Sequence, residues 1–329
     1  MTNQLAANRS QAAVMGDTAV EVVLSIRAEH AEGPLWDAAT ARLWWVDITG
    51  QRVHCSDPAS GNDSSWATAG QPGGVVLAAA GEPVVASPEG LAVLDRNTGT
   101  MDLRVPVERD RTENRANDVK TDGRGRAWVG TMAYDKRPGH AALYRVDRGR
   151  MTCVAEGLTI CNGPAFDEPA GRLYLADTAV SIVDLFDLDP ATGTIDHRRR
   201  FLDFSAAQVW PDGMTVDDEG MLWVALGRAG AVRRYRADGT LDGVVELPVT
   251  NPTSVAFGGD DGGDLYITTS WFDLETDSRA AQPLAGVIFR CRPGVTGPPS
   301  PRYAGVPPPP GPLSKRDPGS LHPEKEGTP

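Results

Sequence analysis

The sequence predicts an all-β fold, a six-bladed β-propeller, and three observations lead to it. Short apolar runs alternate with turns rich in Gly, Asp and Pro from about residue 18 to residue 305, and no long amphipathic helical pattern interrupts them. A turn followed by a strand recurs six times at intervals of 41 to 50 residues, which is the period of a four-stranded propeller blade. A strand at 19–26 can pair with one at 286–292, which would close the ring.

The six copies of this repeat, taken in order, begin at residues 32, 73, 117, 162, 212 and 253. The first and fourth align without a gap and read EGPLWDAATARLWWVD and NGPAFDEPAGRLYLAD. The third and fifth share an acid, a glycine and a tryptophan, and read NDVKTDGRGRAWVG and DGMTVDDEGMLWVA. The second and sixth are weaker and read GGVVLAAAGEPVVA and TSVAFGGDDGGDLYIT. Each copy contains a strand, a tight turn and a second strand, so the following segment must supply two more strands.

The two ends of the chain differ from the repeats. The first 17 residues are small and polar, and residues 306–329 are rich in proline and charge. Neither end can bury enough apolar surface to order itself. We therefore expect a flexible N-terminal extension at 1–17, one propeller domain at 18–305 and a disordered tail at 306–329.

Composition argues against several classes of partner. The formal net charge of −12, from 44 acids and 32 bases, is unsuited to binding nucleic acid. The sequence shows no secretory signal and no apolar run of membrane length, so we expect a cytoplasmic protein without a membrane partner, either a monomer or a small homo-oligomer. The four cysteines are scattered, as in a reduced protein, and the five dispersed histidines form no zinc-binding motif.

The repeat places six equivalent positions around one mouth of the central channel. In a propeller the innermost strands all run in the same direction, so the residue that begins each copy faces the same mouth. These positions hold Glu32, Gly73, Asn117, Asn162, Asp212 and Thr253. Four of them offer amide or carboxylate oxygens, the ligands that Ca²⁺, Mg²⁺ and Mn²⁺ prefer and that Zn²⁺ also accepts. The sequence therefore predicts a central site for one divalent metal ion.

A structural interpretation of the same residues competes with the metal site. Asn-Gly, Asp-Gly and Glu-Gly commonly precede strands as turn residues. A second register, five residues further on, is uniform and is predicted to stabilise the turns; it holds Asp37, Asp122, Asp167 and Asp217. Nucleophilic catalysis has little support, because G-x-S-x-G and S-x-x-K motifs are absent. Cys161 has no equivalent histidine to activate it and is predicted to be a packing residue.

Longer motifs follow one another in a characteristic order along the chain. They include AEGPLWD (31–37), NRANDVKTDGRGRAWVGTM (114–132), CNGPAFD (161–167) and PDGMTVDDEGMLWVA (211–225). With these motifs the chain resembles the SMP-30/gluconolactonase/LRE (regucalcin-like) family from about Glu21 to Gly305. The resemblance implies a six-bladed propeller with one catalytic divalent cation that acts on sugar lactones.

The resemblance also implies roles for individual residues. The metal ligands of the family fall on Glu32, Asn162 and Asp212, and Asp212 is also implied as the catalytic acid or base. The substrate-contacting residues fall on Arg115, Asn117 and Asp135. The chain departs from the family pattern at three positions, where Val119 replaces Gly, Asp135 replaces Glu and Cys161 stands where Ser is frequent.

Three functions remain open at this point. The first is hydrolysis of a small-molecule sugar lactone to its aldonic acid, in which the cation polarises the carbonyl and Asp212 assists the attack of water. The second is a phosphotriesterase-like metal hydrolase that uses the same ring. The third is a non-catalytic, calcium-binding propeller. Apolar walls for a sugar would come from Trp36, Tyr134 or Trp271, and the loop 271–286 is a candidate lid.

Overall fold

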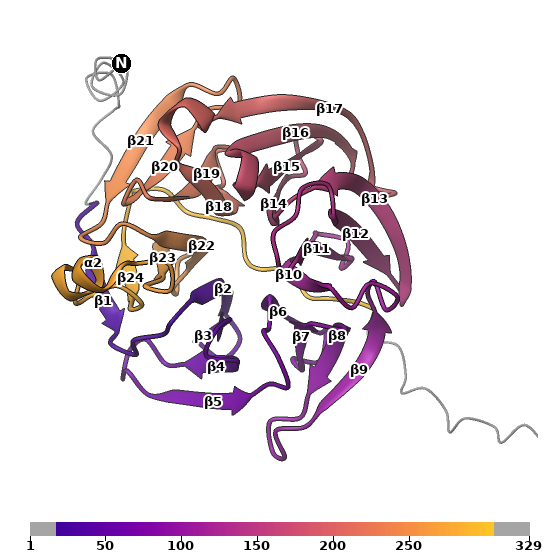
Figure 1. Cartoon of the computed structure of the whole chain (residues 1–329), viewed down its shortest axis with the longest axis horizontal. Coiled ribbons are helices and arrows are strands. Elements are labelled where there is room, and N and C mark those ends of the chain that lie inside the picture. Colours follow the sequence, from indigo (N-terminus) through magenta and orange to yellow (C-terminus); the bar gives the residue numbers. More distant parts are fainter. Residues whose placement is uncertain (1–17, 306–329) are drawn as a thin grey trace, which may run out of the picture.

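Six β-sheets of four strands each stand around a central channel and form a six-bladed propeller (Figure 1). The structure, a computed structural model, describes residues 18–305. The all-β, six-bladed prediction is therefore confirmed. The predicted extension at 1–17 and the predicted tail at 306–329 lie outside the described residues.

The strands pair in sequence order within each of the first five blades. Blade one consists of β2 (Ala31–Asp37), β3 (Arg42–Asp47), β4 (Arg52–Ser56) and β5 (Asp63–Ala67). Blade two consists of β6 (Gly74–Leu77), β7 (Pro83–Ser87), β8 (Gly90–Leu94) and β9 (Met101–Pro106). Blade three consists of β10 (Asn114–Thr121), β11 (Ala127–Ala133), β12 (Ala141–Asp147) and β13 (Arg150–Leu158). Blade four consists of β14 (Cys161–Asp167), β15 (Arg172–Asp177), β16 (Ile182–Asp189) and β17 (Thr194–Asp203). Blade five consists of β18 (Trp210–Val216), β19 (Leu222–Gly227), β20 (Ala231–Tyr235) and β21 (Leu241–Glu246).

The sixth blade joins the two ends of the described chain. It combines β22 (Pro252–Gly258), β23 (Asp264–Thr269), β24 (Ile288–Cys291) and β1 (Glu21–Leu24). β1 pairs antiparallel with β24, so the predicted pairing of 19–26 with 286–292 is confirmed. Because a strand from the start of the chain completes the last blade, the ring cannot open without breaking this sheet.

Helical structure is limited, within residues 18–305, to three short segments. They are α2 (Thr276–Ala281) and the 3-10 turns η1 (Thr178–Val180) and η2 (Ser205–Ala207). No helix in this part of the chain is long and apolar enough to cross a membrane.

Neighbouring blades pack face to face through apolar clusters, because both faces of each blade are buried. In β19, alternate side chains pack into two different interfaces between blades. Trp223 and Ala225 pack against the sixth blade, whereas Leu222, Val224 and Leu226 pack against the fourth. Successive side chains of a strand point to opposite faces, so an apolar run such as LWVAL can fill two cores at once.

The second register of aspartates stabilises turns, as predicted. Asp217 Oδ1 accepts hydrogen bonds from the amides of Glu219 and Met221, and its Oδ2 accepts one from Trp223 Nε1 at 2.8 Å. Asp122 makes the equivalent bond to Trp128 Nε1 at 2.8 Å. The carboxylate thus satisfies the backbone of its own turn and the buried indole of the next strand.

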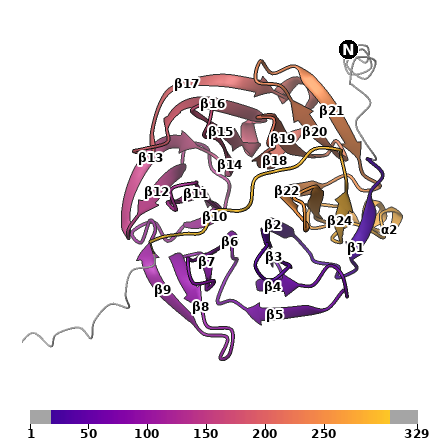
Figure 2. The same cartoon turned by 180° about the vertical axis from the view of Figure 1, so that it is seen from behind.

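A C-terminal strap, residues 292–305, crosses the channel on the face seen in Figure 2. It is fastened to five blades by the pairs Arg292–Asp264, Thr296–Asp218, Arg302–Asp37, Tyr303–Leu77 and Ala304–Gly125. The Tyr303 side chain is 1% exposed and packs between the second and third blades. One mouth of the channel is therefore covered, which leaves the opposite mouth for access to the ring of polar residues.

Candidate functional site

The ring residues lie where the innermost strands lose their regular pairing. The register between the first and second strands of a blade shifts at 32–35 in β2, at 162–165 in β14 and at 211–214 in β18. Gly33 and Gly163 adopt φ values of 55° and 53° there, in the left-handed region that favours glycine. Such irregularities redirect a side chain from the alternation of its strand. The turn residues of the repeat thereby direct the preceding side chains toward the channel.

Five of the six ring positions meet at a cavity of about 390 Å³ at one mouth of the channel. They are Glu32, Gly73, Asn117, Asn162 and Asp212. The sixth, Thr253, instead donates its hydroxyl to the carbonyl oxygen of Ala31. A concave site of this volume suits a small molecule.

The amide side chains of the ring form a chain of hydrogen bonds that ends on a carboxylate. Asn117 Nδ2 donates to Asn162 Oδ1 at 2.6 Å, and Asn162 Nδ2 donates to Asp212 Oδ1 at 2.6 Å. Asn162 Nδ2 also lies 2.9 Å from Thr178 Oγ1, and that hydroxyl donates to the carbonyl oxygen of Pro211. The three ring side chains are therefore held in place relative to one another.

Buried carboxylates surround this chain of amides and form no ion pair, although the positive charge of Lys120 acts on Glu32 and Asp118. Burial and the negative charge of Asp118 raise the pKa of Glu32 to about 8, although its Oε2 accepts a hydrogen bond from Gly33 N–H. Burial and the charges of Glu32 and Asp118 raise the pKa of Asp212 well above its usual range. Within residues 18–305 no lysine or arginine forms an ion pair with any of the three acids.

These donors suit a hard divalent cation. Oxygen ligands that carry uncompensated negative charge are what Ca²⁺, Mg²⁺ and Mn²⁺ select. The described part of the chain holds no group of three or more His, Cys, Asp and Glu side chains that could bind a metal ion, so a site here depends on amide oxygens as well as the acids. As placed, Asn162 turns Oδ1 toward Asn117, and metal ligation would require its amide oxygen and nitrogen to exchange positions.

Asp118 is a buried acid of the site that the ring register does not single out. Its Oδ1 accepts the amide of Val119 at 2.7 Å, and its Oδ2 accepts the amide of Gly163 at 2.9 Å. It lies one residue after a ring position, where other blades carry Gly33, Gly163 and Gly213. An acid among the glycines that directly follow the ring positions was the available signal. Its bond to Gly163 ties the third blade to the turn that carries Asn162.

Cationic and aromatic side chains complete the walls of the cavity. Arg115, an implied substrate contact, is 7% exposed and lines it. Tyr134 also lines the cavity, together with His30, Lys136, Trp210 and Phe272, none of which the repeat places there. The loop 271–286 contributes Phe272 and Asp273.

Two of the aromatic side chains proposed as sugar-facing walls lie elsewhere. Trp36 stacks on Tyr266 with ring centroids 5.5 Å apart, inside the interface between the first and sixth blades. Trp271 packs beneath the Arg279 guanidinium, which lies 3.3 Å from the centroid of its ring. Neither is among the residues that line the cavity.

The structure does not bring Asp135 to the cavity. Its side chain is 55% exposed and forms an ion pair with Arg137 Nε at 2.8 Å. The neighbours Tyr134 and Lys136 line the cavity instead. The implied substrate contacts Arg115 and Asn117 therefore line the cavity without Asp135.

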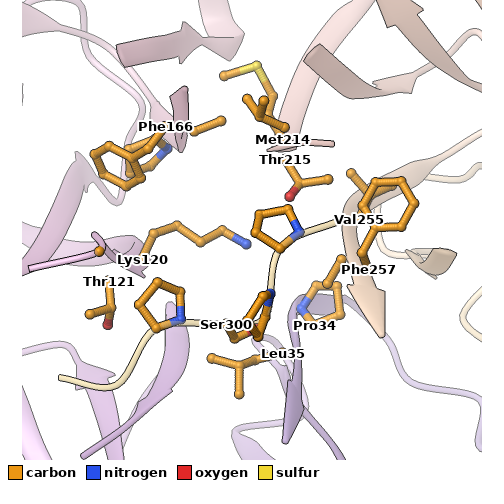
Figure 3. A pocket seen from close by; sticks show the side chains of 18 of the residues that line it. Pro34, Leu35, Lys120, Thr121, Phe166, Met214, Thr215, Val255, Phe257 and Ser300 are labelled. Carbon is orange, nitrogen blue, oxygen red and sulfur yellow. The ribbon is translucent and has the colours of Figure 1, made fainter. Parts of the chain in front are cut away.

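A second cavity, of about 380 Å³, lies at the strapped mouth of the channel (Figure 3). Its walls are mainly apolar, with Leu35, Phe166, Met214 and Phe257 from the innermost strands and residues 298–301 from the strap. Lys120 is the cation among its lining residues. The polar ring and its acids belong to the other cavity, which is the candidate active site.

Comparison with known proteins places the chain in a family. The model of the SMP-30/Gluconolactonase/LRE-like region matches residues 30–271. The pentonolactonase of Haloferax volcanii is 35% identical over 84% of this chain and 95% of its own length. Regucalcin of Gallus gallus is 33% identical over 88% of this chain and 100% of its own length.

A solved structure agrees with these relatives. The crystal structure of a calcium-binding protein, regucalcin, from Agrobacterium tumefaciens is 30% identical and covers 87% of this chain and 97% of its own, with a TM-score of 0.83. The chain belongs to the SMP-30/gluconolactonase/LRE-like family.

Proposed function

We propose that the protein hydrolyses a sugar lactone to its aldonic acid with the help of one divalent cation. The observation that carries the proposal is the buried ring, in which two acids that form no ion pair and two amides face a cavity of small-molecule size. The name of the similar pentonolactonase from Haloferax volcanii supports a lactone as the substrate.

Glu32, Asn162 and Asp212 would hold the cation. When bound, it supplies a Lewis acid that polarises the lactone carbonyl. Calcium, zinc, manganese and magnesium all accept such oxygen ligands, and the calcium-binding relative favours calcium among them.

The protein's own residues would position the substrate and move one proton. Asp212 Oδ1 or Oδ2 takes the proton of the attacking water and returns it to the ring oxygen that leaves as a hydroxyl. Arg115 and Asn117 donate hydrogen bonds to the sugar hydroxyls, which fixes the carbonyl relative to the acids.

The two alternative functions predict different walls. A phosphotriester has no hydroxyl groups for polar side chains to bind, whereas Arg115, Asn117 and Lys136 line this cavity and can bind those of a sugar. A propeller that only bound calcium would have no use for polar side chains set apart from the ligands. The walls therefore favour the sugar lactone.

A lactone-hydrolysis assay with defined metal content tests the proposal. We expect acid release from a panel of pentono- and hexonolactones, its loss after chelation and its recovery with a divalent cation. Asp212→Asn should lower kcat by roughly 100-fold or more, while the exposed control Asp238→Asn should retain activity. Unchanged turnover after verified metal removal would contradict the metal-dependent mechanism, and turnover of no lactone in the panel would contradict the function.

A further inference from the structure

The second cavity of the channel, at the strapped mouth, has no role in the proposed function. It shares no lining residue with the cavity of the polar ring. Its walls come from apolar side chains of the innermost strands, among them Leu35, Phe166, Met214 and Phe257, and residues 298–301 of the strap complete them (Figure 3). A concave, mainly apolar space of about 380 Å³ is large enough for a small organic molecule. We call this space the strap cavity.

Lys120 supplies a positive charge inside the strap cavity. Its side chain leaves β10 and extends between the apolar walls into the cavity (Figure 3). In the part of the chain that the structure describes, its ammonium group forms no hydrogen bond and no ion pair. Its charge acts on the buried acids Glu32 and Asp118, but neither carboxylate pairs with it. An ammonium group has three N–H donors, so a ligand that accepts them is strongly favoured in apolar surroundings.

The other polar groups of the strap cavity suit a ligand with a single negative charge. Thr215, on β18, points its side chain into the cavity, and its hydroxyl forms no hydrogen bond within residues 18–305. The carboxylate of Glu168 also lines the cavity, but it accepts a hydrogen bond from the amide of Gly123. One lysine close to this acid is a poor match for a doubly charged phosphate. One lysine with one free hydroxyl matches a carboxylate.

The wall that the strap contributes is held only at its two ends. Residues 298–301 read Pro-Pro-Ser-Pro, and a proline has no amide hydrogen to donate. Among the described residues, this segment forms no hydrogen bond with the blades, whereas Thr296 before it and Arg302 after it are both fastened. A ligand can therefore enter the strap cavity through a shift of this segment, and the ring of blades need not open.

We propose that the strap cavity binds a monocarboxylate with an apolar body, of the kind of a medium-chain fatty acid, and that Lys120 pairs with its carboxylate. The apolar body displaces water from the side chains of the innermost strands, which supplies most of the affinity. The carboxylate accepts charge-assisted hydrogen bonds from Lys120 and a hydrogen bond from the Thr215 hydroxyl. Because the two cavities share no lining residue, this site does not depend on the proposed lactone hydrolysis.

Three probes with the same chain and different head groups test the proposal. We expect octanoate to bind the full-length protein in calorimetry, and octanol and octylamine to bind at least about tenfold more weakly. Lys120→Met keeps the apolar stem and removes the charge, so it should weaken octanoate binding by about tenfold and leave octanol within about twofold. Lys120→Arg keeps the charge and should retain the preference for octanoate.

Lys136→Met is the matched control, because Lys136 lines the cavity at the opposite mouth. Within residues 18–305 its ammonium group, like that of Lys120, forms no ion pair. This variant should bind octanoate as tightly as the wild type. If Lys136→Met weakens octanoate binding and Lys120→Met does not, the carboxylate occupies the open mouth and the proposal is wrong.

Thr215→Val keeps the proposal testable even if Lys120→Met does not fold. This variant keeps the size of the side chain and removes the hydroxyl, so octanoate binding should weaken by about two- to tenfold. Octanoate should also raise the Tm of the wild type and of Lys136→Met, because it binds the folded state. Absence of octanoate binding, equal binding of octanoate and octanol, tighter binding of octylamine, or unchanged octanoate affinity in both Lys120→Met and Thr215→Val would overturn the proposal.

Discussion

Asp212 lies inside the channel mouth although its Pro-Asp-Gly sequence is typical of a surface turn. It accepts a hydrogen bond from Asn162, and Glu32 lies close enough to raise its pKa. A buried carboxylate without a cation costs free energy, so stability of the turn alone does not explain this placement. A divalent cation would offset this cost, so a substitution that removes an acid from the ring tests whether the ring binds a cation.

Glu32→Gln should have opposite effects on the metal-free and the metal-loaded protein. The substitution keeps the shape of the side chain but removes an acid whose burial raises its pKa to about 8, so at neutral pH the metal-free protein should gain about 1–3 kcal/mol in free energy of unfolding. The stabilisation of the wild type by a divalent cation should largely disappear, because a ligand charge is lost. Thermal unfolding with EDTA and with Ca²⁺ or Mn²⁺ measures both effects. Asp238→Asn should behave like the wild type, and a destabilised metal-free Glu32→Gln protein would contradict the electrostatic interpretation.

His30 should make the protein less stable as the pH falls from about 6.5 to about 4. Burial, followed by the positive charge of Arg115, lowers its pKa to about 4, whereas Asp273 and Asp47 act in the opposite direction. Between these pH values the unfolded chain binds more protons than the folded one, so acidification favours unfolding. His30→Gln should therefore lose less stability over this window than the wild type in urea unfolding. The exposed His197→Gln variant should follow the wild type, and identical pH dependence for His30→Gln would refute the prediction.

At the scale of elements, the innermost strands approach one another so closely that glycine is required at some ring positions. A Cβ at Gly73 would lie 2.0 Å from the carbonyl oxygen of Asn117 and 2.8 Å from that of Ala116. Both contacts are with the backbone of β10, which cannot move without disturbing its own blade. The close packing of β10 therefore explains why the second blade contributes no side chain to the ring.

Gly73→Ala should separate the second and third blades and displace Asn117. We expect a loss of about 1–3 kcal/mol in free energy of unfolding, because the clash cannot be relieved by a side-chain rotation, and a fall in lactone turnover. Gly227→Ala is the matched control, since the nearest atom to its Cβ, in Trp210, would lie at 3.4 Å. Chemical denaturation and lactone hydrolysis measure the two effects. Equal behaviour of both variants would show that the strands can move apart freely.

Local patterns predict the blades well, but they do not predict every member of the site. Strand alternation and turn residues repeat along the chain, so the starts of the six copies and the convergence of Glu32, Asn162 and Asp212 follow from one register. Lys136 and Phe272 come from irregular connections, whose paths depend on tertiary packing. The outward position of Asp135 is set by its ion pair with Arg137, which no repeat encodes.

At the scale of the whole molecule, the strap joins five blades across the mouth that lies opposite the candidate active site (Figure 2). Tyr303 is the aromatic residue of the strap, and its buried hydroxyl makes no hydrogen bond. The strap therefore contributes apolar packing between the second and third blades. The hydroxyl of Tyr303 adds no hydrogen bond to this contribution.

Tyr303→Ala should destabilise the molecule without changing the chemistry of the site. Truncation of a fully buried aromatic side chain costs about 3–5 kcal/mol, which corresponds to a fall of roughly 6–15 °C in Tm for a domain of this size. KM and kcat for a lactone at 25 °C should stay within about twofold of wild type, because the strap covers the other mouth and the variant remains folded at that temperature. Tyr303→Phe keeps the ring, loses only an unpaired hydroxyl and should match or exceed the wild-type Tm. A large change in KM for Tyr303→Ala, with unchanged Tm, would show instead that the strap controls the active site and does not stabilise the ring.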